Sequence, residues 1–168
     1  MKLKILFACA ICAAALCAAT ASSAQTKATM TGTCAKPDVM QSVPAGDKDG
    51  HMFSISQGKC TVKGAVGGVE GKEGVWADHG DGTATRGKVS GLFAATFVNG
   101  DKIFYTYSET TMMKDGAPVS ATNTYQISGG TGKMKGIKGS GTCKLTASGT
   151  DGSMNYSCSG TYTMGAAQ

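Results

Sequence analysis

Residues 128–142 read SGGTGKMKGIKGSGT, and this stretch decides the fold class. Glycine spaced in this way suits a β-strand that bends sharply between two turns, as at the corner of a barrel. Glycine also disfavours helix, and the whole chain contains 25 glycines without any sustained period near 3.6 residues. The sequence therefore predicts an all-β fold.

About eight strands can be counted, which is enough to close a small antiparallel β-barrel whose interior is filled or holds one small ligand. The expected strands are 26–34, 51–56, 59–66, 92–98, 102–113, 119–128, 144–148 and 153–164. Residues 36–50 contain two prolines and the run DKDG, so they are expected to form a loop. Residues 67–87 are rich in glycine and charge, which favours turns around one apolar centre at Val75, Trp76 and Ala77.

The glycine-rich stretch carries a family resemblance. An apolar strand end at Tyr125 and Ile127 is followed by Gly129-Gly130-Thr131-Gly132, and then by a short bulky step and further glycines. This pattern resembles the signature of the allene oxide cyclase and dirigent-protein barrel superfamily. The resemblance covers residues 92–142 best and implies a calycin-like barrel in a secreted bacterial protein. The superfamily includes cyclases, proteins that steer radical coupling and barrels of unknown activity, so the resemblance implies a shape more than a chemistry.

The N-terminus has the pattern of a secretory signal peptide. Lys2 and Lys4 precede an apolar run of about 15 residues, which is shorter than the roughly 20 that span a bilayer. Small residues before Gln25 favour cleavage there, so residues 1–24 are the predicted signal peptide and residues 25–168 a single barrel domain in the periplasm or outside the cell. The alternatives are a membrane anchor and a lipid on Cys17, which would need a small residue where Leu16 stands.

Removal of this segment changes the charge and the cysteine count. The net charge falls from +5 to about +3, which is too mild and too evenly spread to predict a nucleic-acid partner. Seven cysteines become four, and an even number in an exported chain predicts two disulfides. A zinc site would need closely spaced cysteine pairs, which the sequence lacks, so no metal is expected.

One disulfide follows from the register of a hairpin. If Thr150 and Asp151 form the turn, residues that face each other have numbers that sum to 301, as Cys143 and Cys158 do. They would then lie about 4.5–5.5 Å apart, within disulfide range. Cys34 is left to pair with Cys60.

The middle of the chain predicts a three-stranded meander around Asn99-Gly100 and residues 114–117. The numbers of opposed residues would sum to 199 in the first hairpin and to 231 in the second. This register brings together the candidate ligand-binding residues of the barrel interior: Phe93, Phe97, Phe104, Thr106, Ser108, Asn123 and Tyr125. The reverse face is apolar on two strands, so either a subunit contact in a homo-oligomer or a loop or terminal segment covers it. Glu109 points outward in this register, but a slip by one residue would make it an interior carboxylate and an acid or base candidate.

Other chemical signals are weak. His51 is expected at a strand edge, and His79 in a solvated loop. The scattered methionines favour gap-filling packing over a copper site, and residues 129–133 lack the spacing of a phosphate loop. The catalytic residues stay unknown, and we expect neither a cofactor nor a stable membrane anchor.

Two hypotheses follow. The first is a non-catalytic barrel that binds a small apolar or aromatic molecule. The second is a cyclase or isomerase that folds a reactive substrate into one conformer and excludes water. A filled envelope barrel without a ligand is the third alternative.

Overall fold

The computed structural model describes residues 24–115, 117–149 and 151–165. They form one antiparallel sheet of ten strands and a single 3₁₀ turn, η1, which confirms the predicted all-β barrel class. The elements are β1 (Thr26–Cys34), β2 (Val39–Pro44), β3 (Met52–Thr61), β4 (Ala65–Val66), β5 (Val69–Gly82), β6 (Arg86–Phe97), β7 (Lys102–Lys114), β8 (Ala117–Gly130), η1 (Gly132–Met134), β9 (Lys138–Ala147) and β10 (Met154–Thr163). The predicted signal peptide, apart from Ala24, lies outside the described residues.

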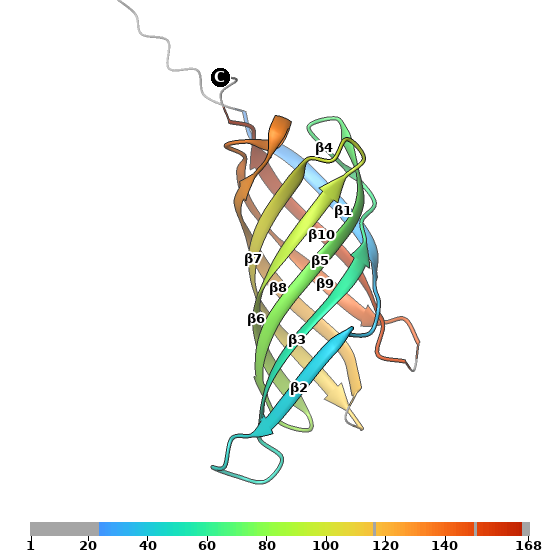
Figure 1. The fold of residues 1–168 in the computed structure, drawn as a ribbon, viewed down its shortest axis with the longest axis vertical. Helices are drawn as coiled ribbons and strands as arrows, with labels where there is room; N and C mark the ends of the chain where they lie inside the picture. Colours follow the sequence, from blue (N-terminus) through green and yellow to red (C-terminus); the bar gives the residue numbers. More distant parts are fainter. Residues whose placement is uncertain (1–23, 116, 150, 166–168) are drawn as a thin grey trace, which may run out of the picture.

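Eight of these strands close a ring in the order β1-β10-β9-β8-β7-β6-β5-β3, and the strands tilt steeply around the long axis (Figure 1). The ring closes where β3 returns to β1. Cys34 pairs with Cys60 there, and the backbone amides and carbonyls of Thr31 and Lys63 exchange hydrogen bonds of 2.9 and 2.8 Å. The other two strands are additions, since β4 pairs with β5 and β2 pairs with β3.

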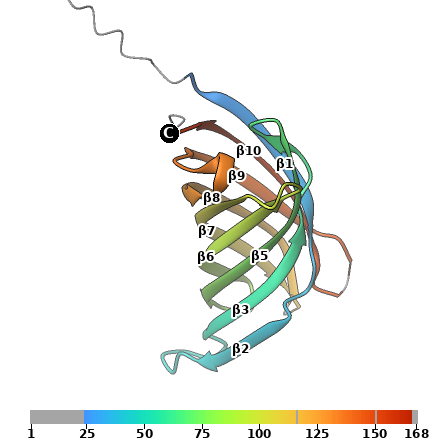
Figure 2. The ribbon, with the colours of Figure 1, turned by 45° about the horizontal axis from the view of Figure 1, so that its top comes forward.

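One end of the barrel is closed by a packed core. Phe97, Ile103, Met134 and Ile137 are at most 2% exposed and belong to one apolar cluster. Met134 ends the η1 turn, which lies at the opposite end of the barrel from β2 (Figure 2). The glycine-rich stretch therefore forms the end of β8, the η1 turn and the start of β9, rather than one bent strand.

The predicted β9–β10 hairpin is confirmed residue by residue. Ala147 faces Met154, Leu145 faces Tyr156 and Cys143 faces Cys158, so opposed residues sum to 301 as expected. Disulfides join Cys143 to Cys158 and Cys34 to Cys60, with Cα atoms 4.0 and 3.9 Å apart.

The predicted register of β7 is wrong by one residue. The β6–β7 loop contains three residues, 98–100, because the Phe97 amide donates to the Asp101 carbonyl and Gly100 takes a φ of +85°. Opposed residues on β6 and β7 therefore sum to 198, and Phe93 faces Tyr105. A bulge between Met112 and Met113 then moves the sum for β7 and β8 from 231 to 232, so Glu109 faces Asn123.

Together the two shifts move β8 by two residues relative to β6, which leaves β6 and β8 in the predicted orientation and turns only β7 over. Phe104, Thr106 and Ser108 are consequently exposed on the outer face. Tyr105, Tyr107 and Glu109 point inward in their place.

Two other segments differ from the prediction. Residues 39–44, expected in a loop, form β2, all of whose residues are exposed. Residues 69–82, expected in turns, form the 14-residue strand β5. Leu92 remains 60% exposed on the outer face without cover from any described segment, so the subunit contact stays a prediction.

Many strand glycines make room for an aromatic ring inside the barrel. A Cβ atom built on Gly58 would lie 2.6 Å from the Trp76 ring, and one built on Gly74 would lie 2.2 Å from the Phe93 ring. A Cβ atom built on Gly91 would likewise crowd the side chain of Tyr107, one on Gly141 that of Tyr125, and one on Gly32 that of Tyr156. These glycines are the reason that a narrow barrel accommodates so many large inward side chains.

Among the described residues there is no helix of sufficient length and apolarity to cross a membrane.

Candidate ligand cavity

The barrel contains a cavity of about 880 Å³ beneath the packed end. Its wall is mostly apolar and includes six aromatic side chains: Trp76, Phe93, Tyr105, Tyr107, Tyr125 and Tyr156. The Phe93 and Tyr105 rings lie 6.0 Å apart between centroids, and Tyr125 meets Tyr105 edge-on at 5.5 Å. This volume falls within the range of small-molecule sites in proteins.

The structure brings together three of the seven residues predicted to bind a ligand. Phe93, Asn123 and Tyr125 line the cavity. Phe97 is inside the barrel but belongs to the packed core, where it is 1% exposed. The other three, Phe104, Thr106 and Ser108, are on the outer face because of the β7 register.

Asp78 forms one of two polar centres inside the cavity. Its carboxylate accepts hydrogen bonds from the Ser56 hydroxyl at 2.5 Å and from the Tyr107 hydroxyl at 2.8 Å. Gly91 lies opposite Tyr107 on β6, and its missing side chain leaves the space that the phenol ring occupies. Burial and then the adjacent Asp78 charge raise the pKa of Tyr107 well above its usual range, so Tyr107 stays a hydrogen-bond donor.

Glu109 forms the second centre. The Thr111 hydroxyl donates to one carboxyl oxygen at 2.8 Å, and the Asn123 amide nitrogen lies 3.4 Å from the other. Burial raises the pKa of Glu109 and the charge of Asp78 raises it further, against the opposing effect of these two hydrogen bonds. A carboxyl group with this balance can hold or release a proton close to a bound molecule.

Two polar atoms in the cavity wall have no partner. The indole nitrogen of Trp76 and the side-chain oxygen of Asn123 are both buried and form no hydrogen bond with any residue that the structure describes. One is a donor and the other is an acceptor. Buried polar groups are nearly always satisfied in proteins, and these two atoms belong to residues that line the cavity.

The tyrosines elsewhere in the wall are held in neutral form. Burial raises the pKa of Tyr156 to about 12, and its hydroxyl donates to the Thr61 carbonyl at 2.9 Å. Burial likewise raises the pKa values of Tyr105 and Tyr125. None of these three phenols supplies negative charge near neutral pH.

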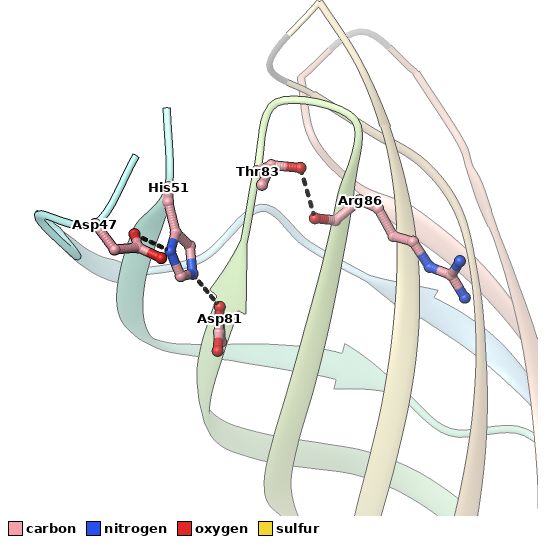
Figure 3. Close-up of polar contacts among 5 residues, drawn as sticks. All are labelled: Asp47, His51, Asp81, Thr83 and Arg86. Atoms are coloured by element: carbon pink, nitrogen blue, oxygen red, sulfur yellow. Dashed lines mark hydrogen bonds and ion pairs between the residues drawn. The ribbon is translucent and has the colours of Figure 1, made fainter. Parts of the chain in front are cut away.

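His51 fastens the loop between β2 and β3 to the end of β5. Its two ring nitrogens each lie 2.5 Å from a carboxylate, Nδ1 from Asp47 and Nε2 from Asp81 (Figure 3). The hydrogen bond to Asp81, followed by that to Asp47, raises the pKa of His51. The neighbouring turn is closed by Arg86, whose carbonyl accepts from the Thr83 amide at 2.8 Å. His51 thus lies next to the cavity rim, which includes Asp81 and Thr83, and its edge position carries a structural contact that sequence reasoning missed.

The described residues contain no cluster of three or more His, Cys, Asp or Glu side chains suited to a metal ion. His79 lies on β5, in a strand rather than in the predicted loop, and is exposed.

Sequence reasoning missed the three residues that most define the cavity chemistry, namely Trp76, Asp78 and Tyr107. The alternation of Gly74, Trp76, Asp78 and Gly80 on one face of a strand is a signal that could have found the first two. The glycines obscured it, because they read as turn formers until their aromatic partners on the next strands are known.

Comparison with known proteins gives only distant likenesses. No protein-family model matches the chain, and no curated protein matches it. The solved structures similar to it include two pterocarpan synthase dirigent proteins. GePTS1 is 13% identical, with 84% of this chain and 92% of that chain covered and a TM-score of 0.46. PsPTS1 is 10% identical, with 86% and 97% covered and a TM-score of 0.47. These values describe only a distant likeness between the backbone of this chain and the backbones of the two dirigent proteins.

Proposed function

We propose that this protein binds one small, ring-bearing molecule inside the barrel. The observation that carries the proposal is a cavity of about 880 Å³ whose wall combines six aromatic side chains with polar residues, and two polar atoms of that wall, Trp76 Nε1 and Asn123 Oδ1, have no hydrogen-bond partner among the described residues. A ligand with one acceptor and one donor would satisfy both atoms, and its rings would pack on the aromatic wall.

The chain carries its own reporter for this proposal. Trp76 is the only tryptophan in the sequence and lines the cavity, so its fluorescence should change when the cavity fills. We would titrate 4-phenylbutan-1-ol and n-butylbenzene, which share a ring and a chain but differ in the hydroxyl group. Saturable changes with both compounds, and tighter binding of the alcohol, are the expected result.

A matched pair of variants identifies the site. Asn123→Ala should weaken binding of the alcohol by about 0.5–1.5 kcal/mol and leave n-butylbenzene unaffected, because only the alcohol can donate to the amide oxygen. Thr106→Ala, on the outer face of β7, should change neither affinity. If neither compound gives a saturable signal, and native mass spectrometry of gently purified protein shows only the apo mass, the third alternative of a barrel without a ligand replaces this proposal.

The two disulfides support the further proposal that the protein works in an oxidising compartment, either the periplasm or outside the cell. Labelling of free thiols in protein taken directly from its own cells would test it. Protection of the cysteines in the mature chain is expected, and four free thiols would refute the proposal.

The position of Glu109 favours a second candidate function, that of an isomerase or cyclase. Its carboxyl group faces the cavity, and burial raises its pKa, so it could exchange a proton with a bound substrate. For any compound that the native protein retains and converts, Glu109→Gln should abolish turnover while binding persists. Unchanged turnover in that variant would exclude Glu109 as the acid or base.

A further inference from the structure

The cavity is acidic at its centre. Asp78 and Glu109 both face inward, and Asp78 is close enough for its charge to act on Glu109. Among the described residues that line the cavity, Lys36 and Lys88 are the only basic ones, and both are exposed to solvent. The inner wall therefore holds carboxyl groups without a compensating cation.

The hydrogen-bond donors that the described residues supply to these carboxyl groups are all neutral. Ser56 and Tyr107 donate to Asp78, and Thr111 and Asn123 donate to Glu109. Neutral donors satisfy the oxygen atoms but leave the net charge in place, and a buried charge of this kind is costly until an opposite charge meets it.

The aromatic wall adds a second attraction of the same sign. The faces of indole, phenol and benzene rings carry negative electrostatic potential and attract organic cations. Trp76, Phe93, Tyr105, Tyr107 and Tyr125 line the same space as the two carboxyl groups. A cavity that combines these features favours cations and opposes anions.

We propose that the ligand class of this cavity is an aromatic amine, bound with its ammonium group between Glu109 and Asp78 and its ring against the aromatic wall. The unpartnered oxygen of Asn123, whose amide group also contacts Glu109, would accept an ammonium hydrogen. The Trp76 N–H would meet an oxygen acceptor on the ligand, such as a hydroxyl or ether. This inference rests on the proposed function, because it names the ligand for the same cavity.

Three compounds test this proposal because they share one carbon skeleton but differ in charge: 4-phenylbutylamine is a cation, 4-phenylbutan-1-ol is neutral and 4-phenylbutanoate is an anion. Their affinities for the wild-type protein would be measured near neutral pH by Trp76 fluorescence and by calorimetry. The amine should bind about tenfold more tightly than the alcohol, and the carboxylate most weakly. The comparison needs no variant, so misfolding cannot obscure it.

Variants then assign the preference to the interior carboxyl groups. Glu109→Gln and Asp78→Asn should each reduce the advantage of the amine over the alcohol and leave the alcohol affinity within about twofold. Glu73→Gln removes a carboxylate that is 60% exposed on β5 and should change none of the affinities.

The outcomes separate the two proposals. If the alcohol binds as tightly as the amine, or the carboxylate binds most tightly, charge selection is overturned while binding in the barrel stands. An advantage of the amine that survives both interior variants also overturns charge selection, because surface charge would then be its source. If none of the three compounds binds, both proposals fail together.

Discussion

The indole ring of Trp76 occupies the space that a side chain on Gly58 would need. The two residues face each other on β5 and β3, and a Cβ atom added to Gly58 would lie 2.6 Å from the ring. We expect Gly58→Ala to displace Trp76, to shift its fluorescence and to lower the free energy of unfolding by about 1–3 kcal/mol, as overpacking does.

The control for this substitution is Gly87→Ala on β6. The nearest atom to a Cβ atom at Gly87 is 3.8 Å away, so the methyl group has room. Chemical denaturation should show little loss of stability in this variant. Equal losses in the two variants would mean that the aromatic ring is not what requires glycine at position 58.

A pair of phenylalanine substitutions tests the register of β7. Phe97 is 1% exposed within the packed core, and Phe97→Ala should cost about 3–5 kcal/mol. Phe104 is 38% exposed on the outer face, and Phe104→Ala should cost about 1 kcal/mol or less. Denaturation midpoints of the two variants decide the matter, since a large cost at Phe104 would restore the register in which it points inward.

The β7 register could not be predicted because it depends on two local irregularities, a longer loop and a bulge, that the strand pattern does not show. Val98 extends the loop to three residues and shifts β7 by one residue, and the bulge between Met112 and Met113 shifts β8 by one more. Both sides of β7 carry aromatic residues, so its hydrophobic pattern does not choose a face. The β9–β10 hairpin was predictable because two cysteines fixed its register independently of the pattern.

The bridge from His51 to Asp47 and Asp81 should make stability depend on pH. These partners raise the pKa of His51, so the contribution is complete below the ordinary histidine pKa of about 6.5 and is lost as the pH rises through the raised value. At low pH, protonation of Asp47, whose pKa is lowered by its hydrogen bond to His51, also removes part of this contribution. The melting temperature of wild type minus that of His51→Gln should therefore be largest between the pH at which Asp47 is protonated and the raised pKa of His51. The difference should fall toward zero in alkali.

The matched control for the histidine bridge is His79→Gln, since His79 is exposed on β5. Its melting temperature should follow that of the wild type across the pH series. A difference between wild type and His51→Gln that does not vary with pH would show that the bridge contributes through shape rather than charge.

Glu109 should produce a pH dependence of the same sign from a different cause. Burial raises its pKa, so the folded protein keeps a proton that the unfolded chain releases, and stability falls as the pH rises from the ordinary glutamate value through the raised one. Glu109→Gln removes this loss. Its stability relative to wild type should therefore increase over that interval in thermal melts.

Glu73→Gln, at an exposed carboxylate, should show no such trend. A constant difference between wild type and Glu109→Gln at every pH would contradict the raised pKa of Glu109.

The strand β5 shows why much of the candidate site escaped prediction. Its glycines at positions 71, 74, 80 and 82 resemble a series of turns, yet Gly74 is required by Phe93 on β6. Glycine in a strand becomes interpretable only when its register with the neighbouring strand is known, and Phe93 lies 19 residues after Gly74 in the sequence. The predicted exterior Glu109 became an interior residue through the same dependence on pairing.

Both disulfides belong to the cavity wall, since all four cysteines line it. A molecule that fills the cavity would cover these sulfur atoms, and a reductant would have to compete with it for access. Occupancy and redox state are then thermodynamically linked: if the disulfide-bonded barrel binds the molecule more tightly than the reduced barrel does, the bound molecule makes the disulfides harder to reduce by the same factor. The lifetime of the disulfide-bonded barrel outside an oxidising compartment would then increase with the concentration of such a molecule.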